Sequence, residues 1–213
     1  MINWSRVKIR YTLNMEPAPE HGLLVVISGP SGVGKTTIVH RVRDTFDAVF
    51  SVSATTRPQS KSETNGEDYY FISPEQFNEK VDNNEFLEHA EVFGCHRYGT
   101  LKKPVEETLA SGRIMLLDID VQGGIQVRDN MPQSVRIFIL PPNEQELLHR
   151  LELRGREDEE SIQRRFKDAT QEIKLAQSSG AYSYFIVNDD LELAIAEAVA
   201  IISKSRNNAA TPS

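Results

Sequence analysis

The chain has 213 residues, 39% of them hydrophobic and 26% charged, which is typical of a single globular domain with a sizeable core. Its formal net charge of −7 argues against nucleic acid or an anionic membrane as a partner, because broad binding to either needs a cationic surface. The chain has no apolar stretch long enough to span a bilayer, and its only cysteine is Cys95, so a reducing compartment such as the cytoplasm is expected.

The two ends of the chain differ in composition from the part between them. Residues 1–20 are polar, contain Pro17 and Pro19, and lack the apolar centre of a secretory signal. We expect them to form a flexible extension, and residues 206–213 to form a disordered tail. The globular part is expected to be one domain over residues 21–205.

Four short apolar runs predict strands that are buried on both faces. These runs are residues 23–28, 114–120, 135–140 and 184–188. Helical segments separate them: one over about residues 34–46, one that ends at Gly112, and a closing helix over residues 190–205. This order predicts a three-layer α/β fold with a parallel sheet and crossover helices.

Two inserted regions interrupt the alternation. Residues from about 53 to 100 contain short strand-like pieces around one helix, which should begin with a capping box formed by Ser73 and Gln76. Residues from about 143 to 180 are expected to form a helical lid of two helices joined by a loop, with Asn143 capping the first. The core is then left with residues 21–52, 101–142 and 181–205.

A glycine-rich motif directly follows the first predicted strand. Its residues, which match G-x-x-x-x-G-K-[ST] in full, are Gly29, Pro30, Ser31, Gly32, Val33, Gly34, Lys35 and Thr36. In such a loop, backbone N–H groups surround phosphate oxygens, and the following helix directs its positive end at them. The lysine reaches the β- and γ-phosphates, and the threonine hydroxyl can ligate Mg²⁺. The motif therefore predicts a core of the P-loop NTPase type and an ATP site that extends to Thr37, whereas a chance glycine turn is the competing interpretation.

A P-loop alone does not define the reaction. GTPases usually read guanine with an N-K-x-D string, which the chain lacks, and a helicase or a polynucleotide kinase would need a cationic surface. The expected second substrate is therefore a small molecule that accepts a phosphoryl group and binds to the first insertion.

Eight segments, taken together and in order, resemble the guanylate kinase family over roughly residues 22–205. They are SGPSGVGKTT (28–37), SVSATTR (51–57), NGEDYYF (65–71), FLEHAEVF (86–93), RYGT (97–100), LLDIDVQG (116–123), RLELRGREDEESIQRR (150–165) and IVNDDL (186–191). The resemblance implies a Mg²⁺-dependent enzyme of purine nucleotide metabolism that transfers a phosphoryl group from ATP to GMP and dGMP. It leaves the oligomeric state open.

The resemblance also implies a GMP-binding site in the first insertion. Guanine presents N1–H and the N2 amine side by side, a donor pair that a carboxylate can match. By resemblance, Glu88 and Asp120 accept from these donors. The other residues that the resemblance implies for GMP binding are Ser53 and Thr100 as hydroxyl contacts, Arg57, Tyr69 and Tyr98 at the phosphate, Glu63 as the organiser of its loop, and Asp118 beside Asp120 at the end of a strand.

The implied mechanism needs no general base, because the nucleophile is an already ionised oxygen of the GMP phosphate. Catalysis then consists of alignment and of neutralising the transferred group. The expected catalytic cations are Lys35, Arg57, Arg150, Arg154 and Arg165. Thr36 and Asp118 are expected to hold Mg²⁺, partly through water, and Asn188 is the implied contact to adenine.

The sequence departs from the family pattern in the GMP-binding insertion. The family's T-T-R-x-P-R-x-G-E reads TTRPQSKSE here, so Ser60 replaces a second arginine at the phosphate. We expect Lys61 to take over that contact, with a solvated lysine as the competing interpretation. The segment FGCHRYGT also has one residue more than the usual F-G-N-Y-Y-G-T.

Three other functions compete with a guanylate kinase. A scaffold module that binds phosphopeptides on this fold typically loses the P-loop lysine, whereas Lys35 is present. A kinase for another small phosphorylated acceptor would not need the guanine-matching acids Glu88 and Asp120. The third alternative is a P-loop ATPase without an acceptor.

Overall fold

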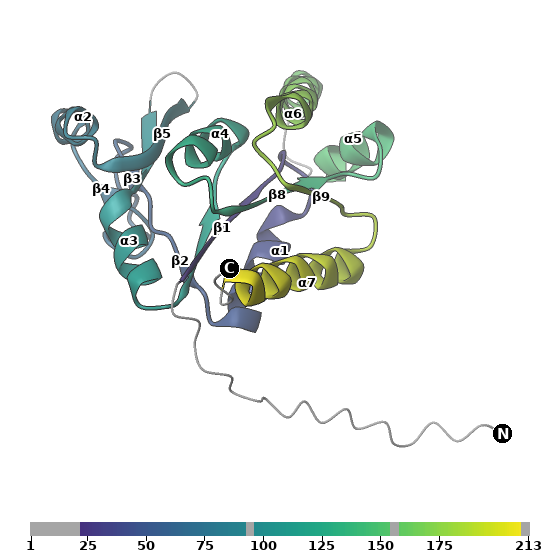
Figure 1. Ribbon diagram of the computed structural model, residues 1–213. Coiled ribbons are helices and arrows are strands. Elements are labelled where there is room, and N and C mark those ends of the chain that lie inside the picture. The colour runs from purple at the N-terminus through teal and green to yellow at the C-terminus, as the bar shows by residue number, and fades with distance from the viewer. Residues whose placement is uncertain (1–21, 93–95, 154–157, 210–213) are drawn as a thin grey trace.

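The computed structural model describes residues 22–92, 96–153 and 158–209, and the predicted extension of residues 1–20 lies outside this part of the chain. Strands and helices alternate as predicted, and they form a three-layer α/β architecture (Figure 1). Within the described residues, no helix is both long enough and apolar enough to span a membrane.

A parallel sheet of five strands forms the centre of the core. In spatial order its strands are β2 (Val49–Phe50), β7 (Ile114–Asp118), β1 (Leu23–Ser28), β8 (Val135–Leu140) and β9 (Tyr184–Val187). β1 lies between β7 and β8, with Ile27 opposite Asp118 on one side and Ile137 on the other. The carboxyl ends of β1 and β7 therefore meet at one edge of the sheet, where folds of this kind bind ligands.

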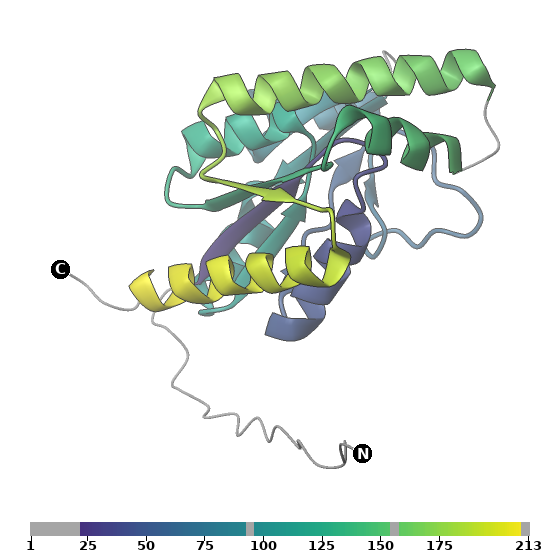
Figure 2. The same ribbon diagram turned by 90° about the vertical axis from the view of Figure 1, so that its right-hand side faces the viewer.

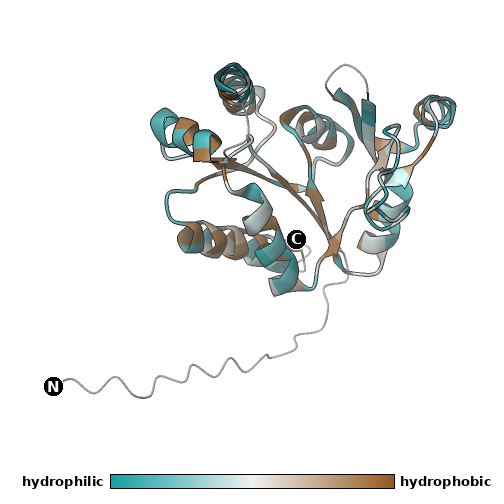
Figure 3. Cartoon of the chain, turned by 180° about the vertical axis from the view of Figure 1, so that it is seen from behind, coloured by the Kyte–Doolittle hydropathy of each residue, from teal (hydrophilic) through white to brown (hydrophobic). Residues whose placement is uncertain are grey.

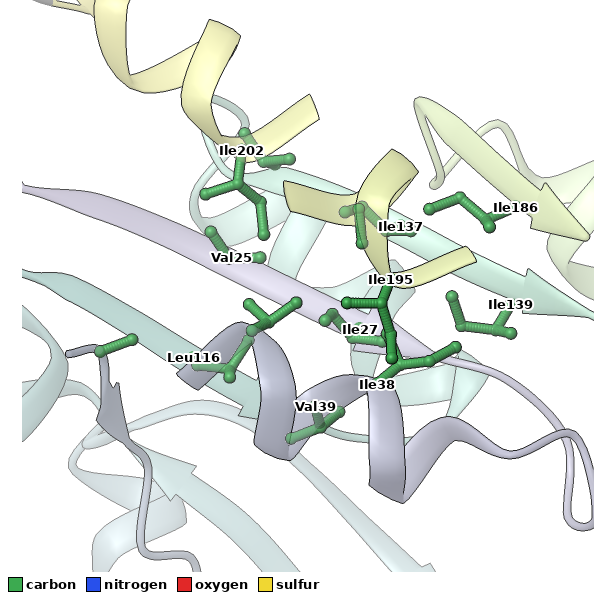
Figure 4. Close-up of a cluster of buried hydrophobic side chains, with 14 of the residues drawn as sticks. Val25, Ile27, Ile38, Val39, Leu116, Ile137, Ile139, Ile186, Ile195 and Ile202 are labelled. Atoms are coloured by element: carbon green, nitrogen blue, oxygen red, sulfur yellow. The ribbon is translucent and has the colours of Figure 1, made fainter. Parts of the chain in front are cut away.

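Helices cover both faces of this sheet, as a parallel sheet requires. α1 (Lys35–Phe46) and α7 (Leu191–Ala209) pack on one face, and α3 (Lys102–Ala110) and α4 (Val121–Asn130) pack on the other. On the first face, Ile27 of β1 is fully buried between Ile38 of α1 and Ile195 of α7 (Figure 4). The strands of the core sheet are hydrophobic almost throughout, whereas hydrophobic and hydrophilic residues alternate along the helices (Figure 3).

A second, smaller sheet belongs to the first insertion. Its strands, in spatial order, are β4 (Tyr70–Phe71), β3 (Ala54–Thr55), β6 (His96–Leu101) and β5 (Phe86–Val92), and α2 (Pro74–Asp82) packs on it. The predicted capping box of α2 is present: the Ser73 hydroxyl accepts from the Gln76 N–H, and the Gln76 side chain accepts from the Ser73 N–H. Phe77 of α2 stacks on Phe86 with 4.5 Å between ring centroids, which gives this lobe a core of its own.

The second insertion forms two helices, α5 (Glu144–Leu153) and α6 (Glu159–Ser179). Asn143 caps α5 as predicted, because its Oδ1 accepts from the Glu146 N–H at 2.8 Å. Leu147 and Leu151 of α5 pack against Ala169 of α6. α6 runs along the side of the molecule opposite α7 (Figure 2).

Some boundaries differ from those predicted. The strand-like piece FSVSATT (50–56) does not form one strand, because the chain crosses there from β2 in the core sheet to β3 in the lobe sheet. β7 ends at Asp118 rather than at residue 120, since Asp120 leaves the strand to cap α4. Residues 206–209 are not a disordered tail but the last turn of α7, which extends the helix that Ile202 anchors in the core.

Candidate active site

The P-loop connects β1 to α1 and borders a cavity of about 330 Å³. Gly32 and Gly34 both have a φ of 87°, a conformation that residues with side chains rarely adopt. α1 begins at Lys35, so the positive end of the helix faces the cavity. The predicted residues from Gly29 to Thr36 all line this cavity, together with Asp118, Asp120 and Glu172, whereas Thr37 is exposed on the first turn of α1.

Lys35 and Asp118 form an ion pair at the edge of the cavity, with 2.5 Å between Nζ and Oδ1. Thr36 lines the same cavity. A hydroxyl and a carboxylate suit Mg²⁺, which keeps several waters and takes its other ligands from phosphate oxygens. The donor set therefore fits Mg²⁺ held together with phosphates. Consistent with such an open site, the described residues contain no cluster of three or more His, Cys, Asp or Glu side chains that could hold a metal by themselves.

Asn188, the implied adenine contact, has a different partner in the structure. Its side chain is only 4% exposed, and Nδ2 donates to the Val33 carbonyl of the P-loop at 2.7 Å. A Cβ atom on Gly34 would lie 2.5 Å from this nitrogen, so the two residues are in close contact. Asn188 thus supports the P-loop through the Val33 carbonyl, and this contact accounts for a buried asparagine at this position without any bound nucleotide.

The lid places one of its predicted arginines at the P-loop. Arg165 of α6 donates from Nη2 to the Ser31 hydroxyl at 2.6 Å. Arg150 of α5 instead donates to the Glu146 carboxylate at 2.7 Å and to the Asn188 carbonyl at 3.0 Å, so the structure does not bring it to the phosphate cavity. Arg154 lies outside the described residues.

The first implied base-reading residue, Glu88, is buried between β5 and β6. Its Oε1 accepts from the Thr100 hydroxyl at 2.6 Å and from the Thr100 N–H at 2.9 Å. Burial raises the pKa of Glu88 to about 7, although the bonds from Thr100 act in the opposite direction and the negative charge of Asp120 adds to the rise. The Thr100 hydroxyl, expected to contact GMP, is therefore used to hold Glu88.

A second cavity, of about 240 Å³, opens beside Glu88. It is lined by Ser53, Tyr69, Glu88, Ala90, Tyr98, Asp118, Ile119 and Asp120. The structure thus brings together most of the implied GMP-binding residues from five separate segments. Asp118 and Asp120 line both this cavity and the P-loop cavity, so the two sites share a wall.

Arg57 contacts Tyr69, which lines the second cavity, and it is held by an acid and by aromatic rings. Its two terminal nitrogens lie 3.0 and 2.5 Å from the carboxylate oxygens of Glu63. Its guanidinium carbon is 5.4 Å from the centroid of Tyr69, whose ring in turn meets Tyr98 edge to face. The hydrogen bonds from Arg57, and then those from Ser60, lower the pKa of Glu63 to about 2, so the pair stays ionised at neutral pH.

The family model that matches the sequence is described as guanylate kinase and covers residues 21–205. The chain belongs to the guanylate kinase family. A guanylate kinase of Anaeromyxobacter dehalogenans is 48% identical over 187 residues, which are 87% of this chain and 81% of that protein. A guanylate kinase of Clostridium tetani is 44% identical over 187 residues, 88% of each chain. The crystal structure of guanylate kinase from Anaplasma phagocytophilum matches with a TM-score of 0.67 at 35% identity and covers 88% of both chains.

Within this guanylate kinase fold, the divergent loop is stabilised by Ser60. The Ser60 N–H and hydroxyl donate to Glu63 Oε2 at 2.8 and 2.7 Å. Lys61 is exposed and has no hydrogen bond or ion pair with the part of the chain that the structure describes, so its contact with phosphate stays a prediction. In the other divergent segment, Arg97 stacks on Phe77 at 4.2 Å, away from the cavity that the next residue, Tyr98, lines.

One residue of this guanylate kinase site was missed from the sequence. Glu172 of α6 lines the P-loop cavity, where burial raises its pKa to about 7 and the nearby Lys35 lowers it. It follows Arg165 and Asp168 at a spacing that places all three on one side of α6, where they border a further cavity. That spacing was the available signal, but the direction in which this side faces could be seen only in three dimensions.

Proposed function

We propose that the protein transfers the γ-phosphoryl group of ATP to GMP, giving ADP and GDP, and that it accepts dGMP in place of GMP. One observation carries this proposal: Asp118 and Asp120 line both the P-loop cavity and the second cavity, which is called the acceptor cavity from here on. Because the two cavities share the wall that these residues form, a nucleotide in each would lie next to the other, which direct transfer between them requires.

The acceptor cavity has the chemistry to select guanine. Glu88 is fixed on Oε1 by Thr100, and its Oε2 lies on the side of α4 that carries Asp120. Two carboxylates near each other can accept from N1–H and from the N2 amine of guanine, whereas adenine has an acceptor at N1 and only a C–H at C2. At the other end, Arg57, Tyr69 and Tyr98 offer a cation and two hydroxyls for the GMP phosphate.

Catalysis would rest on alignment and charge. The attacking oxygen belongs to the GMP phosphate and needs no base to remove a proton. Lys35 would neutralise charge on the β- and γ-phosphates, and Arg165, which already reaches Ser31 of the P-loop, would do so from the lid side. Thr36 and Asp118 would hold Mg²⁺, which supplies further positive charge at the phosphates.

A coupled assay that measures ADP release tests the proposal. ATP should be consumed with GMP and dGMP, and much more slowly with AMP or without acceptor. ATP consumption independent of acceptor would instead identify an ATPase, and turnover with a phosphorylated sugar would identify a different kinase. GMP binding without turnover would identify a binding module.

A further inference from the structure

One side of α4 carries a row of residues directed at β5. The row consists of Asp120, Gly123, Gln126 and Asn130, spaced three or four residues apart, so that the four lie on one side of the helix. Asp120 caps the helix by accepting from the Gly123 N–H at 2.8 Å. The remaining three residues contact Glu88 or its immediate neighbours in β5.

Gln126 pairs with the main chain of His89, the residue after Glu88. Its Oε1 accepts from the His89 N–H at 3.1 Å, and its Nε2 donates to the His89 carbonyl at 2.9 Å. β5 is the outer strand of its sheet, so these backbone groups point away from β6. The glutamine amide therefore pairs with the strand edge as a neighbouring strand would.

Asn130 holds the residue on the other side of Glu88. The pairing of β5 with β6 shifts register between Phe86 and Glu88, which makes Leu87 the additional residue of a β-bulge. Asn130 Nδ2 donates to the Leu87 carbonyl at 2.7 Å. Bulges redirect neighbouring side chains, and this one is stabilised from α4 next to the residue that faces the cavity.

Gly123 gives the Glu88 carboxylate its place against α4. A Cβ atom at Gly123 would lie 2.8 Å from Glu88 Oε2, closer than side-chain carbons come to other atoms. The carboxylate is thus fixed from three sides: by Thr100 on Oε1, by the surface of α4 on Oε2, and by the two amides that hold Leu87 and His89.

We propose that Gln126 and Asn130 are positioning residues for base recognition, because they set the Glu88 carboxylate at a fixed separation from Asp120 on the same helix. Neither touches the nucleotide. The proposal rests on the proposed function, since it takes the acceptor to be a guanine nucleotide that both acids read. It assigns part of the specificity for guanine to a helix of the core rather than to the lobe that carries Glu88.

The test replaces Gln126 with methionine, which keeps the length of the side chain and removes both hydrogen bonds. The matched control is Gln177→Met, at an exposed glutamine of α6. Binding of GMP and of IMP, which lacks the N2 amine, is measured by calorimetry on the full chain, along with steady-state KM for GMP and ATP and the melting temperature. Asn130→Ala is measured in the same way.

We expect Gln126→Met to weaken GMP binding about tenfold, as the loss of one or two hydrogen bonds would, and to leave KM for ATP within about twofold. IMP binding should weaken less, so that the preference for GMP over IMP shrinks. Asn130→Ala should act in the same direction, and Gln177→Met should match the parent.

The proposal is overturned if the two variants lower the melting temperature but leave GMP binding unchanged, because the amides would then be structural only. Equal weakening of GMP, IMP and ATP binding would also overturn it. The binding measurement separates this proposal from the proposed function: a parent protein that binds GMP but does not phosphorylate it would refute the kinase, while the variants would still decide whether α4 positions Glu88.

Discussion

Arg57 and Glu63 form a bidentate ion pair, and the Glu63 carboxylate also accepts from the N–H and hydroxyl of Ser60. A guanidinium held in this way keeps one orientation, above the ring of Tyr69. Its remaining N–H groups can then meet a phosphate without first being ordered.

Glu63→Gln should therefore weaken the acceptor side rather than strengthen it, although it removes a negative charge near a phosphate. We expect KM for GMP to rise about fivefold to tenfold, since Arg57 loses its orientation and Ser60 loses a charged acceptor. Steady-state kinetics with GMP varied at saturating ATP measures the effect. Glu67→Gln, at an exposed acid of the same loop, is the control, and a lower KM in Glu63→Gln would contradict the expected role.

GMP use should depend on the ionisation of Glu88. Its pKa of about 7 is raised by burial, and only the ionised form can accept from both guanine donors. kcat/KM for GMP should therefore fall as the pH drops below about 7, in addition to any fall caused by the phosphate itself. In Glu88→Gln the step near pH 7 should be absent, and the remaining KM for GMP should be raised far more than KM for ATP.

The same shift gives a stability prediction with the opposite pH dependence. Because the folded state favours protonated Glu88, the stabilising contribution of this proton is present at low pH and is lost as the pH rises to about 7. The melting temperature of Glu88→Gln minus that of the parent should therefore increase from acidic pH to pH 8. A difference in melting temperature that does not change with pH would count against a raised pKa.

Lys61 should contribute to phosphate binding through its charge alone. It is exposed, so we expect Lys61→Ala to raise KM for GMP about fivefold at low ionic strength and less at high ionic strength. Ser60→Arg should lower KM for GMP by supplying a second guanidinium that can bind the phosphate through two hydrogen bonds, provided that the backbone N–H at position 60 still donates to Glu63. Lys103→Ala on α3 is the control, and an unchanged KM in Lys61→Ala at both ionic strengths would leave the solvated-lysine interpretation standing.

Asn188 can be tested as a support of the P-loop against its role as an adenine contact. Asn188→Leu leaves the Val33 carbonyl without its donor, which should cost about 1–3 kcal/mol of unfolding free energy and raise KM for the phosphoryl donor. If Asn188 only supports the loop, KM should rise equally for ATP and for GTP used as donor. A loss confined to ATP would instead show that the residue reads adenine.

The features that the sequence predicted well are those that depend on neighbours in the chain. The P-loop follows from consecutive glycines after an apolar run, and the capping box of α2 follows from Ser73 and Gln76, three residues apart. The strands of the core sheet were visible because strands buried on both faces are continuously apolar. The two-residue strand β2 was not predicted, because it is too short to form an apolar run, and the end of β7 was misjudged at Asp120, which caps α4 instead.

The features that could not be predicted depend on contacts between distant segments. The hydrogen bond from Asn188 to Val33 joins residues 155 positions apart, and Gln126 meets His89 across 37. Nothing in the local pattern distinguishes these amides from exposed ones such as that of Gln177. Thr100 shows the same limit: the resemblance implies a hydroxyl contact with GMP, but the structure shows this hydroxyl donating to Glu88, and only the pairing of β5 with β6 reveals this.

Asn188 connects α5 of the lid to the P-loop. Its side chain holds the Val33 carbonyl, and its own carbonyl accepts from Arg150, which is also bound to Glu146 in α5. A short relay therefore runs from α5 through one asparagine into the P-loop. A substitution at Arg150 is therefore expected to act on the P-loop through Asn188, although Arg150 does not line the phosphate cavity.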